Sequence, residues 1–427
     1  MTVNPKFKSA IKRGTGEAYL LMKSNPDIDF SNYIIKASFS NLSYDNQSEG
    51  SRAKYIFELI QLSKQKEKIR KAILKRLSTE RKDTWALVQL FDLAALFAKN
   101  GDEESKKAIY KRFYKKTIQG SEWAGQRAII ELDGFKGLQY VMEIRGKIIK
   151  NNSEEWEDNS LINFFQEKNP TINVRKKLAE ASKNNEYIKT YLDTVKRTIA
   201  QRPKHRKSKV NYHLVTERIA KNYIVPLPPL HAKKLSQKDI IKLADDFLRV
   251  LKEKDRIKLE KYMRVFDRVK YPYNYAPILT LAKSKNKKSD SLVEYASGAL
   301  KYFSGNDIRK FALEILNKKG APFEYLDLLV ANYQKGDYKL LTNIIQRAKT
   351  EDEIHSLVYG YINIYKANKT KECKKPLEAM YDKLTCGIHR TDIVKILIEN
   401  NLLSAKIKRE IMFDSSDETR NLISKKR

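Results

Sequence analysis

The chain has 427 residues, 41% of them hydrophobic, and its 85 lysines and arginines against 52 acidic residues give a net charge of +33. This length exceeds the roughly 250–300 residues at which one compact core stops growing, so two compact domains or one elongated body are expected. With only 15 glycines and 11 prolines, the chain has too few turn residues for a protein of many short strands, and the composition predicts an all-α fold.

The charge is the most unusual property of the composition. A charge of +33 attracts polyanions, which favours nucleic acid as the partner. Two alternatives stay open. The first is compositional drift in a chain rich in Lys, Asn and Ile, so that the charge has no specific partner. The second is binding to an acidic protein or a membrane surface. The chain has no apolar run near the roughly 20 residues that span a bilayer, and its first residues, MTVNPKFKSAIKR, lack the apolar core of an export signal. We therefore expect a cytoplasmic protein with reduced cysteines, no cofactor and no membrane partner.

Near the start of the chain, the stretch KRGTGEAYLLMK places the tripeptide Gly14-Thr15-Gly16 before an apolar run. A phosphate loop of the Walker type needs G-x-x-x-x-G-K-[ST], and a dinucleotide fingerprint needs a third glycine after a strand; the sequence has neither pattern here. We predict instead that Thr15 caps a helix from about Glu17 to Met22. Beside the start of that helix, Arg13 can hold one phosphate of a bound strand.

Amphipathic segments of about 11 to 18 residues, separated by short polar turns, follow one another along the chain. Two neighbouring apolar stripes consist of Tyr55, Ile56, Leu59, Ile60 and Leu62, and of Ile69, Ala72, Ile73 and Leu77. Helices joined by such short turns pack antiparallel. The sequence therefore predicts a succession of αα-hairpins.

Two predicted helices, within 64–76 and 106–118, carry rows of basic residues on a face away from their apolar stripe. The lysines recur at three- and four-residue steps, and an arginine accompanies the second row: Lys64, Lys68, Lys71, Lys75, Lys107, Lys111, Arg112 and Lys115. Like charges at this spacing repel by about a few tenths of a kcal/mol per pair. Either a bound polyanion compensates this cost or the fold tolerates it. We predict that these residues contact the phosphates of a nucleic acid.

A short pattern recurs at the start of several predicted helices, in which glycine and aspartate precede charged residues and an apolar stripe. It occurs in GDEESKKAIYKRF (101–113), GNDIRKFALEIL (305–316) and GDYKLLTNII (336–345). The glycine lets the chain turn, and the aspartate can accept hydrogen bonds from the free N–H groups of the next helix. The last two stretches begin about 31 residues apart, near the period of helical-repeat arrays. The sequence therefore predicts an α-solenoid of stacked antiparallel helix pairs.

The stretch ASGALKYFSGNDIRKFALEIL (296–316) has small and apolar residues, then a turn acid, then an amphipathic helix. The positions that form this pattern are Ala296, Ala299, Leu300, Asp307, Ile308, Arg309, Ala312 and Leu316. EGSRAKYIFELI (49–60) repeats part of it with Arg52, Ala53 and Leu59. These stretches resemble HEAT repeats. The resemblance implies a HEAT-like solenoid and says little about function, because such solenoids serve many partners.

A break in the helical pattern follows. RPKHRKSKVNYH, which begins at residue 202, is basic and has little apolar periodicity, and VPLPP (225–229) cannot lie inside a regular helix. We predict a helical-repeat domain over 1–201, a connector over 202–238 and a second helical-repeat domain over 239–427. The basic cluster of the connector would extend the lysine rows as a flexible clamp: Arg202, Lys204, Arg206, Lys207 and Lys209. PLPP also satisfies the PxxP spacing of groove ligands, although we favour an ordinary linker.

Groups with catalytic or metal-binding chemistry are sparse. Cys373, Cys386 and His389 lack the paired spacing of a structural zinc site, so we expect core thiols and no metal. The acidic clusters at 153–159 and 351–353 suit helix starts better than an acid–base pair. The tyrosines of KYPYNYAP (270–277) either stack on bases or, as we favour, pack on the next hairpin.

Three functions are open at this point. The first, which we favour, is non-enzymatic binding of DNA or structured RNA through its phosphate backbone, without sequence readout. The second is a scaffold for an acidic protein partner. The third is an enzyme that resembles the HEAT-like alkylpurine DNA glycosylases, whose sites pair a tryptophan with a carboxylate one helical turn later. Four residues after each tryptophan this chain has no carboxylate, so no catalytic residue is predicted: Trp85, Trp123 and Trp156 are followed by Gln89, Arg127 and Ser160.

Overall fold

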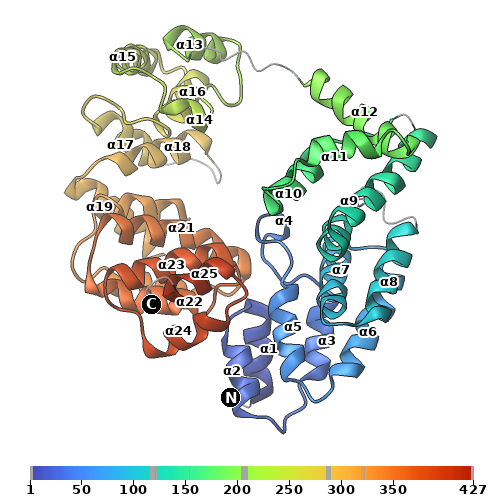
Figure 1. The fold of residues 1–427 in the computed structure, drawn as a ribbon. Coiled ribbons are helices and arrows are strands. Elements are labelled where there is room, and N and C mark those ends of the chain that lie inside the picture. Colours follow the sequence, from blue (N-terminus) through green and yellow to red (C-terminus); the bar gives the residue numbers. More distant parts are fainter. Residues whose placement is uncertain are drawn as a thin grey trace. The chain divides into compact units, whose positions relative to one another are not determined.

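The computed structural model describes residues 3–115, 121, 123–152, 154–202, 210–284, 290–318, 320 and 323–424. Over these residues all regular secondary structure is helical and no β-strand occurs, which confirms the all-α prediction (Figure 1). None of the described helices is both long and apolar enough to cross a membrane.

The chain divides into two compact units. Unit 1 comprises Met1–His205, Thr385–Ile388 and Ser404–Arg427. Its helices, with η marking a 3-10 helix, are α1 (Val3–Arg13), α2 (Glu17–Ser24), α3 (Ser31–Ser38), α4 (Asn46–Glu49), α5 (Ala53–Leu62), α6 (Lys66–Thr79), α7 (Thr84–Lys99), α8 (Glu103–Tyr114), α9 (Gln126–Asn151), α10 (Ser160–Lys168), α11 (Val174–Ala181), α12 (Glu186–Gln201), α24 (Ala405–Glu410), η4 (Ile411–Phe413) and α25 (Asp417–Ser424).

Unit 2 comprises Arg206–Leu384 and His389–Leu403. Its helices are α13 (Tyr212–Ala220), α14 (Pro229–Ala232), α15 (Gln237–Glu253), α16 (Arg256–Phe266), α17 (Ala276–Ala282), α18 (Ser291–Ala299), η1 (Leu300–Tyr302), α19 (Asn306–Leu316), η2 (Phe323–Leu329), α20 (Tyr338–Arg347), α21 (Glu351–Ala367), η3 (Lys371–Cys373), α22 (Lys374–Tyr381) and α23 (Gly387–Glu399), whose first two residues belong to unit 1. Two short helices, α13 and α14, lie within the predicted connector; the domain boundaries at 201 and 239 remain a prediction.

Several helix starts follow the predicted capping chemistry. Gly101 turns the chain with a positive φ of 92°, and the Asp102 carboxylate accepts a hydrogen bond from the backbone N–H of Glu104 at the start of α8 (3.1 Å). The acidic cluster at 351–353 opens α21, where Thr350 and Glu353 form a capping box. Both starts confirm that local sequence sets these helix boundaries.

The same prediction is wrong at Asp337, whereas Asp307 accepts from a free N–H of the next helix without being its N-cap residue. Asp337 makes no capping hydrogen bond to α20; its carboxylate accepts from the backbone N–H of Gln334 (2.8 Å) and pairs with Arg309 (2.6 Å). Asp307 lies inside the first turn of α19 and accepts from its immediate neighbour, Ile308 (2.9 Å). At Asp337 the charged guanidinium competes successfully for the carboxylate, because charge-assisted hydrogen bonds are stronger than neutral ones.

Thr15 does not cap α2. The predicted helix is present as α2, but its N-cap residue is Gly16, without a side-chain capping bond, and the Thr15 hydroxyl is buried with no hydrogen-bond partner among the described residues. Gly14, with φ at +73°, ends α1, and its N–H donates to Ala10 O (2.9 Å). The tripeptide therefore marks a helix boundary, as predicted, although through a glycine turn instead of a threonine cap.

Polar contacts between helices recur at a nearly constant sequence separation. In unit 1 they join residues 32 to 36 positions apart: Arg70 to Asp102, Lys99 to Glu131, and Lys150 to Glu186. In unit 2 the separation is 32 to 34 positions: Tyr212 to Asp246, Lys301 to Asp267, and Tyr275 to Asp307. These contacts join helices or the turns beside them that lie about 32 to 36 residues apart in the sequence.

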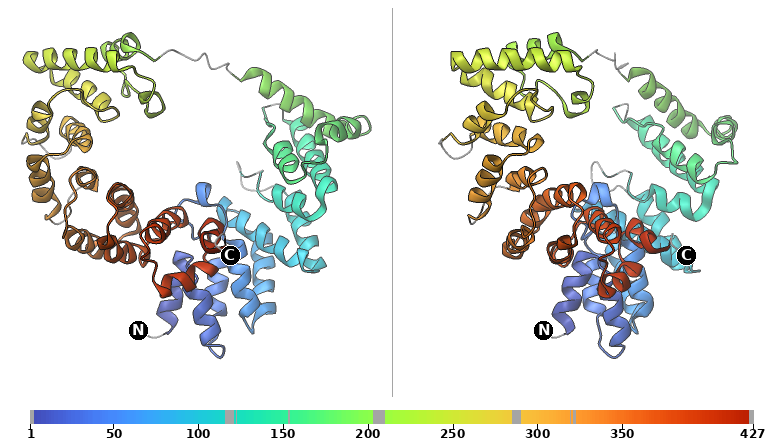
Figure 2. Two further views of the ribbon diagram at one scale, coloured as in Figure 1. Left: turned by 60° about the vertical axis from the view of Figure 1, so that its left-hand side comes forward. Right: turned by 90° about the vertical axis from the view of Figure 1, so that its left-hand side faces the viewer.

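The residues after Leu403 depart from this local pattern. Residues 404–424, which form α24, η4 and α25, pack against α2, α5 and the turn after α1 in the same unit, more than 300 positions away in sequence. In both views of Figure 2 these red helices lie against the blue N-terminal helices. Segments from the N-terminal and C-terminal parts of the described chain are therefore in contact within unit 1.

Candidate nucleic-acid interface

The two predicted basic helices, α6 and α8, lie side by side and parallel in unit 1 (Figure 1). Near their N-terminal ends, Arg70 of α6 donates to the carboxylates of Asp102 (2.9 Å) and Glu104 (2.8 Å). Near their C-terminal ends, Arg112 of α8 donates to the carbonyl oxygens of Leu77 (2.9 Å) and Glu80 (2.7 Å). Because these contacts join residues 32 to 35 positions apart, the two helices have a fixed register.

This register brings two rows of lysines together. Both helices contact α7 and bury their apolar faces, whereas the lysine-bearing faces are exposed. An offset of 32 residues places Lys75 level with Lys107. We call the set Lys71, Lys75, Lys107 and Lys111 the lysine strip. Lys115, the residue that ends α8, is exposed beyond it.

The lysine strip is little neutralised by the protein itself. Lys71 approaches Glu67 at 3.6 Å, in an exposed ion pair of small energetic value. Lys75, Lys107 and Lys111 form no ion pair with any residue that the structure describes. The neighbouring acids Glu67 and Glu104 are held by Arg70, on the seam between the helices. A phosphate that approaches the strip therefore displaces no strong internal partner.

The first two lysines of the α6 row face a different neighbour. Lys64 pairs with Asp27 at 2.9 Å, and both side chains are largely exposed. The Lys68 ammonium donates to the hydroxyl of Ser31 in α3 (3.2 Å). These two lysines remain solvent-accessible but lie on the side of α6 that meets α3, so they stand beside the strip and not in it.

Two of the predicted arginines are buried, which disfavours a role as surface phosphate ligands. Arg112 is only 4% exposed, and its guanidinium fastens α8 to the carbonyl groups at the end of α6; burial lowers its pKa. Arg13 is 9% exposed and pairs with Glu17 at 2.7 Å. Arg112 follows Ile109 by three positions and precedes Phe113, so its place in the apolar stripe was the signal that it is buried.

The basic cluster of the predicted connector is only partly visible. Arg202 follows α12 and pairs with Asp158 at 2.9 Å, so it belongs to the packing of unit 1. Lys204, Arg206, Lys207 and Lys209 lie outside the described residues. Their role as a clamp stays a prediction.

No protein-family model and no curated protein matches the chain. The lysine strip must accordingly be interpreted from its own geometry and charge.

The other candidate groups have structural roles. Tyr271 is buried against Phe247 and Phe266, and this burial raises its pKa to about 12. The Tyr273 hydroxyl donates to Asp245 (2.6 Å), and the Tyr275 hydroxyl donates to Asp307 (2.9 Å). These contacts agree with packing on neighbouring hairpins and not with base stacking. Pro226, the first proline of PLPP, is buried, which disfavours the motif as a groove ligand.

The remaining polar candidates are likewise part of the core. Cys373 and Cys386 are buried free thiols, and burial raises the pKa of Cys373 to about 11. Gln89, four residues after Trp85, is buried, and its amide donates to the carbonyl oxygens of Ala37 (2.9 Å) and Ser40 (3.0 Å). The carboxylates of Glu155 and Glu157 bind Arg145, so this acidic cluster is an ion-pair network rather than a free acid–base pair.

The sequence did not reveal Arg70 as a key residue of the interface. One guanidinium contacts three carboxylates, those of Glu67, Asp102 and Glu104, and these contacts raise its pKa. Arg70 lies within the basic row of α6 and resembles the lysines around it. Only the register of α6 against α8 distinguishes a bracing arginine from a lysine that is available to a ligand.

Proposed function

We propose that this chain is a HEAT-like helical-repeat protein that binds nucleic acid through the phosphate backbone, without reading sequence and without catalysing a reaction. The observation that carries the proposal is the parallel pairing of α6 and α8, with two rows of exposed lysines at a fixed register. Polar contacts repeated every 32 to 36 residues support a stacked array, because a repeat in such an array touches mainly its neighbours.

The chemistry of the strip suits a phosphate backbone. Lysine acts there as a point charge that tolerates many geometries, whereas base readout relies on the fixed fork of arginine or on amide groups. Neighbouring lysines at helical spacing repel one another, so a bound polyanion relieves a cost that the free protein carries. Each phosphate contact also releases condensed counterions, which favours binding at low salt.

A salt titration tests the proposal. Four phosphate contacts predict a slope near −3.6 for log K against log salt with duplex DNA, so affinity falls about 150-fold between about 50 and 200 mM salt. We expect this loss in filter binding with two duplexes of equal length and unrelated sequence, and equal affinity for both. Absent binding, or binding that salt leaves unchanged, removes the proposal. Nuclease-resistant capture of an acidic protein, together with no binding of nucleic acid, would instead assign the strip to a protein scaffold.

A further inference from the structure

Two tryptophans meet at one end of the lysine strip. Trp85 lies in the first turn of α7, one short turn after the end of α6, and Trp123 lies just before α9. Their ring centroids are 5.3 Å apart, and the ring planes are inclined by 63°. Trp85 is half-buried, whereas Trp123 is 42% exposed. The two residues, which we call the indole pair, therefore present aromatic surface to solvent.

Hydrogen bonds fix Trp85 at the end of α6 and α8 where the strip stops. The Glu80 carboxylate accepts from backbone N–H groups of the turn after α6, among them that of Lys82 (2.8 Å). The Glu80 carbonyl oxygen accepts from Arg112 of α8 (2.7 Å). Asp83 then caps α7 by accepting from the N–H of Trp85 (2.9 Å). Trp85 is therefore anchored through one turn to both helices of the strip.

A glycine turn places Trp123 beside α7. Gly125 has a φ of +86°, and a Cβ on it would overlap the ring of Phe91 in α7. Ala124, between Trp123 and Gly125, is 1% exposed. The backbone that follows Trp123 is thus packed on α7, while its indole stays accessible to solvent.

Three further basic residues lie at the same end of the strip. Arg81 and Lys82 belong to the turn between α6 and α7, and Lys115 ends α8. All three are exposed, and none forms an ion pair within the part of the chain that the structure describes. Burial lowers the pKa of Arg112, and the nearby charge of Arg81 adds to this effect. Positive charge thus continues from the strip to the indole pair.

The third tryptophan of the chain has a different setting. Trp156 is 68% exposed, more than Trp123, but it lies between Glu155 and Glu157 in an acidic segment. Because carboxylates repel a polyanion, exposure alone does not mark Trp156 as a site for nucleic acid. Trp156 is therefore a matched control for Trp123 within unit 1.

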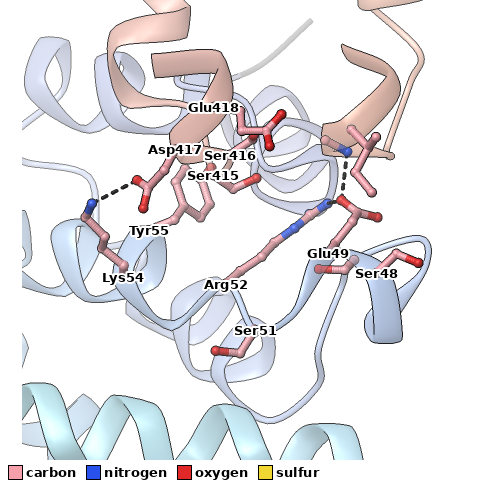
Figure 3. Close-up of a pocket in the computed structure, with 13 residues that line it drawn as sticks. Ser48, Glu49, Ser51, Arg52, Lys54, Tyr55, Ser415, Ser416, Asp417 and Glu418 are labelled. Atoms are coloured by element: carbon pink, nitrogen blue, oxygen red, sulfur yellow. Dashed lines mark hydrogen bonds and ion pairs between the residues drawn. The ribbon is translucent and has the colours of Figure 1, made fainter. Parts of the chain in front are cut away.

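A polar cavity of about 280 Å³ elsewhere in unit 1 is a weaker candidate for binding a strand (Figure 3). Its two basic residues face carboxylates: Lys54 pairs with Asp417 at 2.8 Å, and Arg52 lies 3.6 Å from Glu49. Glu418 adds a further negative charge to the lining. Because acidic groups outnumber basic ones there, the cavity does not attract phosphate as the strip does.

We infer that the ligand of the lysine strip carries unpaired bases beside its phosphate backbone, as a single-stranded overhang does, and that a base stacks on Trp123, supported by Trp85. The inference deepens the proposed function and rests on it. The phosphates meet the lysines and the basic residues beyond them, while an unpaired base meets an aromatic face. Every base has a face that can stack, so this contact adds affinity without reading sequence.

Fluorescence tests the inference without disturbing the indole pair. Full-length protein with Trp156→Phe keeps Trp85 and Trp123 as its only tryptophans, because the chain has three. It is titrated at one salt concentration with a blunt duplex and with partial duplexes that have a 5′ or a 3′ overhang, all matched in number of phosphates. We expect an overhang to quench the indole fluorescence and to raise the affinity about fivefold or more. The blunt duplex should bind with little quenching.

Trp123→Leu removes the aromatic face and keeps an apolar side chain. This variant should bind an overhang no more tightly than the blunt duplex, whereas the control Trp156→Leu should prefer the overhang as wild type does. The inference is overturned by a folded Trp123→Leu protein that keeps the preference, by equal affinities of Trp156→Phe for all the duplexes, or by overhangs that leave its fluorescence unchanged. Each of these results leaves the proposed function intact.

Failure of every duplex to bind at low salt overturns the proposed function and, with it, base stacking on the indole pair. Should Trp123→Leu not fold, the fluorescence titration of Trp156→Phe decides alone.

Discussion

Replacing Lys71, Lys75, Lys107 and Lys111 with glutamine is expected to lower the affinity for duplex DNA about four-thousandfold at about 0.1 M salt, because each lost phosphate contact removes roughly a factor of eight. The same variant should reduce the salt slope by about 3.6. Glutamine has a helix propensity close to that of lysine, and all four residues are exposed, so the fold should be retained. Filter binding over a salt series measures both quantities, and circular dichroism confirms the fold.

The control for this variant changes the same number of charges elsewhere in unit 1. Lys6, Lys8, Lys176 and Lys183 are exposed and make no ion pair with a described residue. Their replacement by glutamine should weaken binding only through the loss of overall charge, with the salt slope nearly unchanged. If the two quadruple variants lose affinity equally, net charge governs binding and the strip has no special role.

Arg145→Met is expected to destabilise unit 1 by about 3–5 kcal/mol, because it leaves a buried carboxylate without its partner. Arg145 is 4% exposed; its guanidinium donates to Glu155 (3.0 Å) and to Glu157, whose side chain is also largely buried. Burial already raises the pKa of Glu157, and the guanidinium opposes that rise. Urea unfolding monitored by far-ultraviolet circular dichroism measures the loss.

The loss of unfolding free energy in Arg145→Met depends on pH, because the pKa of Glu157 is raised in the folded state. A carboxyl group whose pKa is raised in the folded state binds more protons there than in the unfolded chain, so it stabilises the fold as the pH drops through that raised pKa. Without Arg145 the pKa of Glu157 rises further. The loss of unfolding free energy in Arg145→Met should therefore be largest at neutral pH and smaller below the raised pKa of Glu157. Arg175→Met, at an exposed arginine without an ion pair to a described residue, should change stability by less than about 0.5 kcal/mol.

Local sequence was sufficient to predict those parts of the fold that depend on neighbouring residues. Apolar periodicity predicted the helices, and Gly101 with Asp102 predicted the start of α8, because both signals act within one or two turns. Asp337 departed from the same pattern because Arg309, 28 positions away, pairs with its carboxylate. A pairwise contact over that distance leaves no trace in a short sequence window.

The candidate site was predicted in part, for a similar reason. Helical spacing was enough to find the exposed lysine rows, but it could not show that α6 and α8 lie parallel with an offset of 32 to 35 residues. Charge alone also could not separate Arg70 and Arg112, which brace the helices, from the lysines beside them. The role of Gly14 and Gly16 was beyond prediction, because Glu410 and Ser415, which approach these glycines closely, are about 400 positions away in the sequence.

The most direct test of the lysine strip is the acetylation reactivity of individual lysines, measured by mass spectrometry with and without duplex DNA. Binding at the strip predicts that Lys71, Lys75, Lys107 and Lys111 lose reactivity when DNA is bound, whereas Lys6, Lys8, Lys176 and Lys183 stay reactive. Protection spread evenly over both sets, or confined to the second set, would contradict a nucleic-acid interface on α6 and α8.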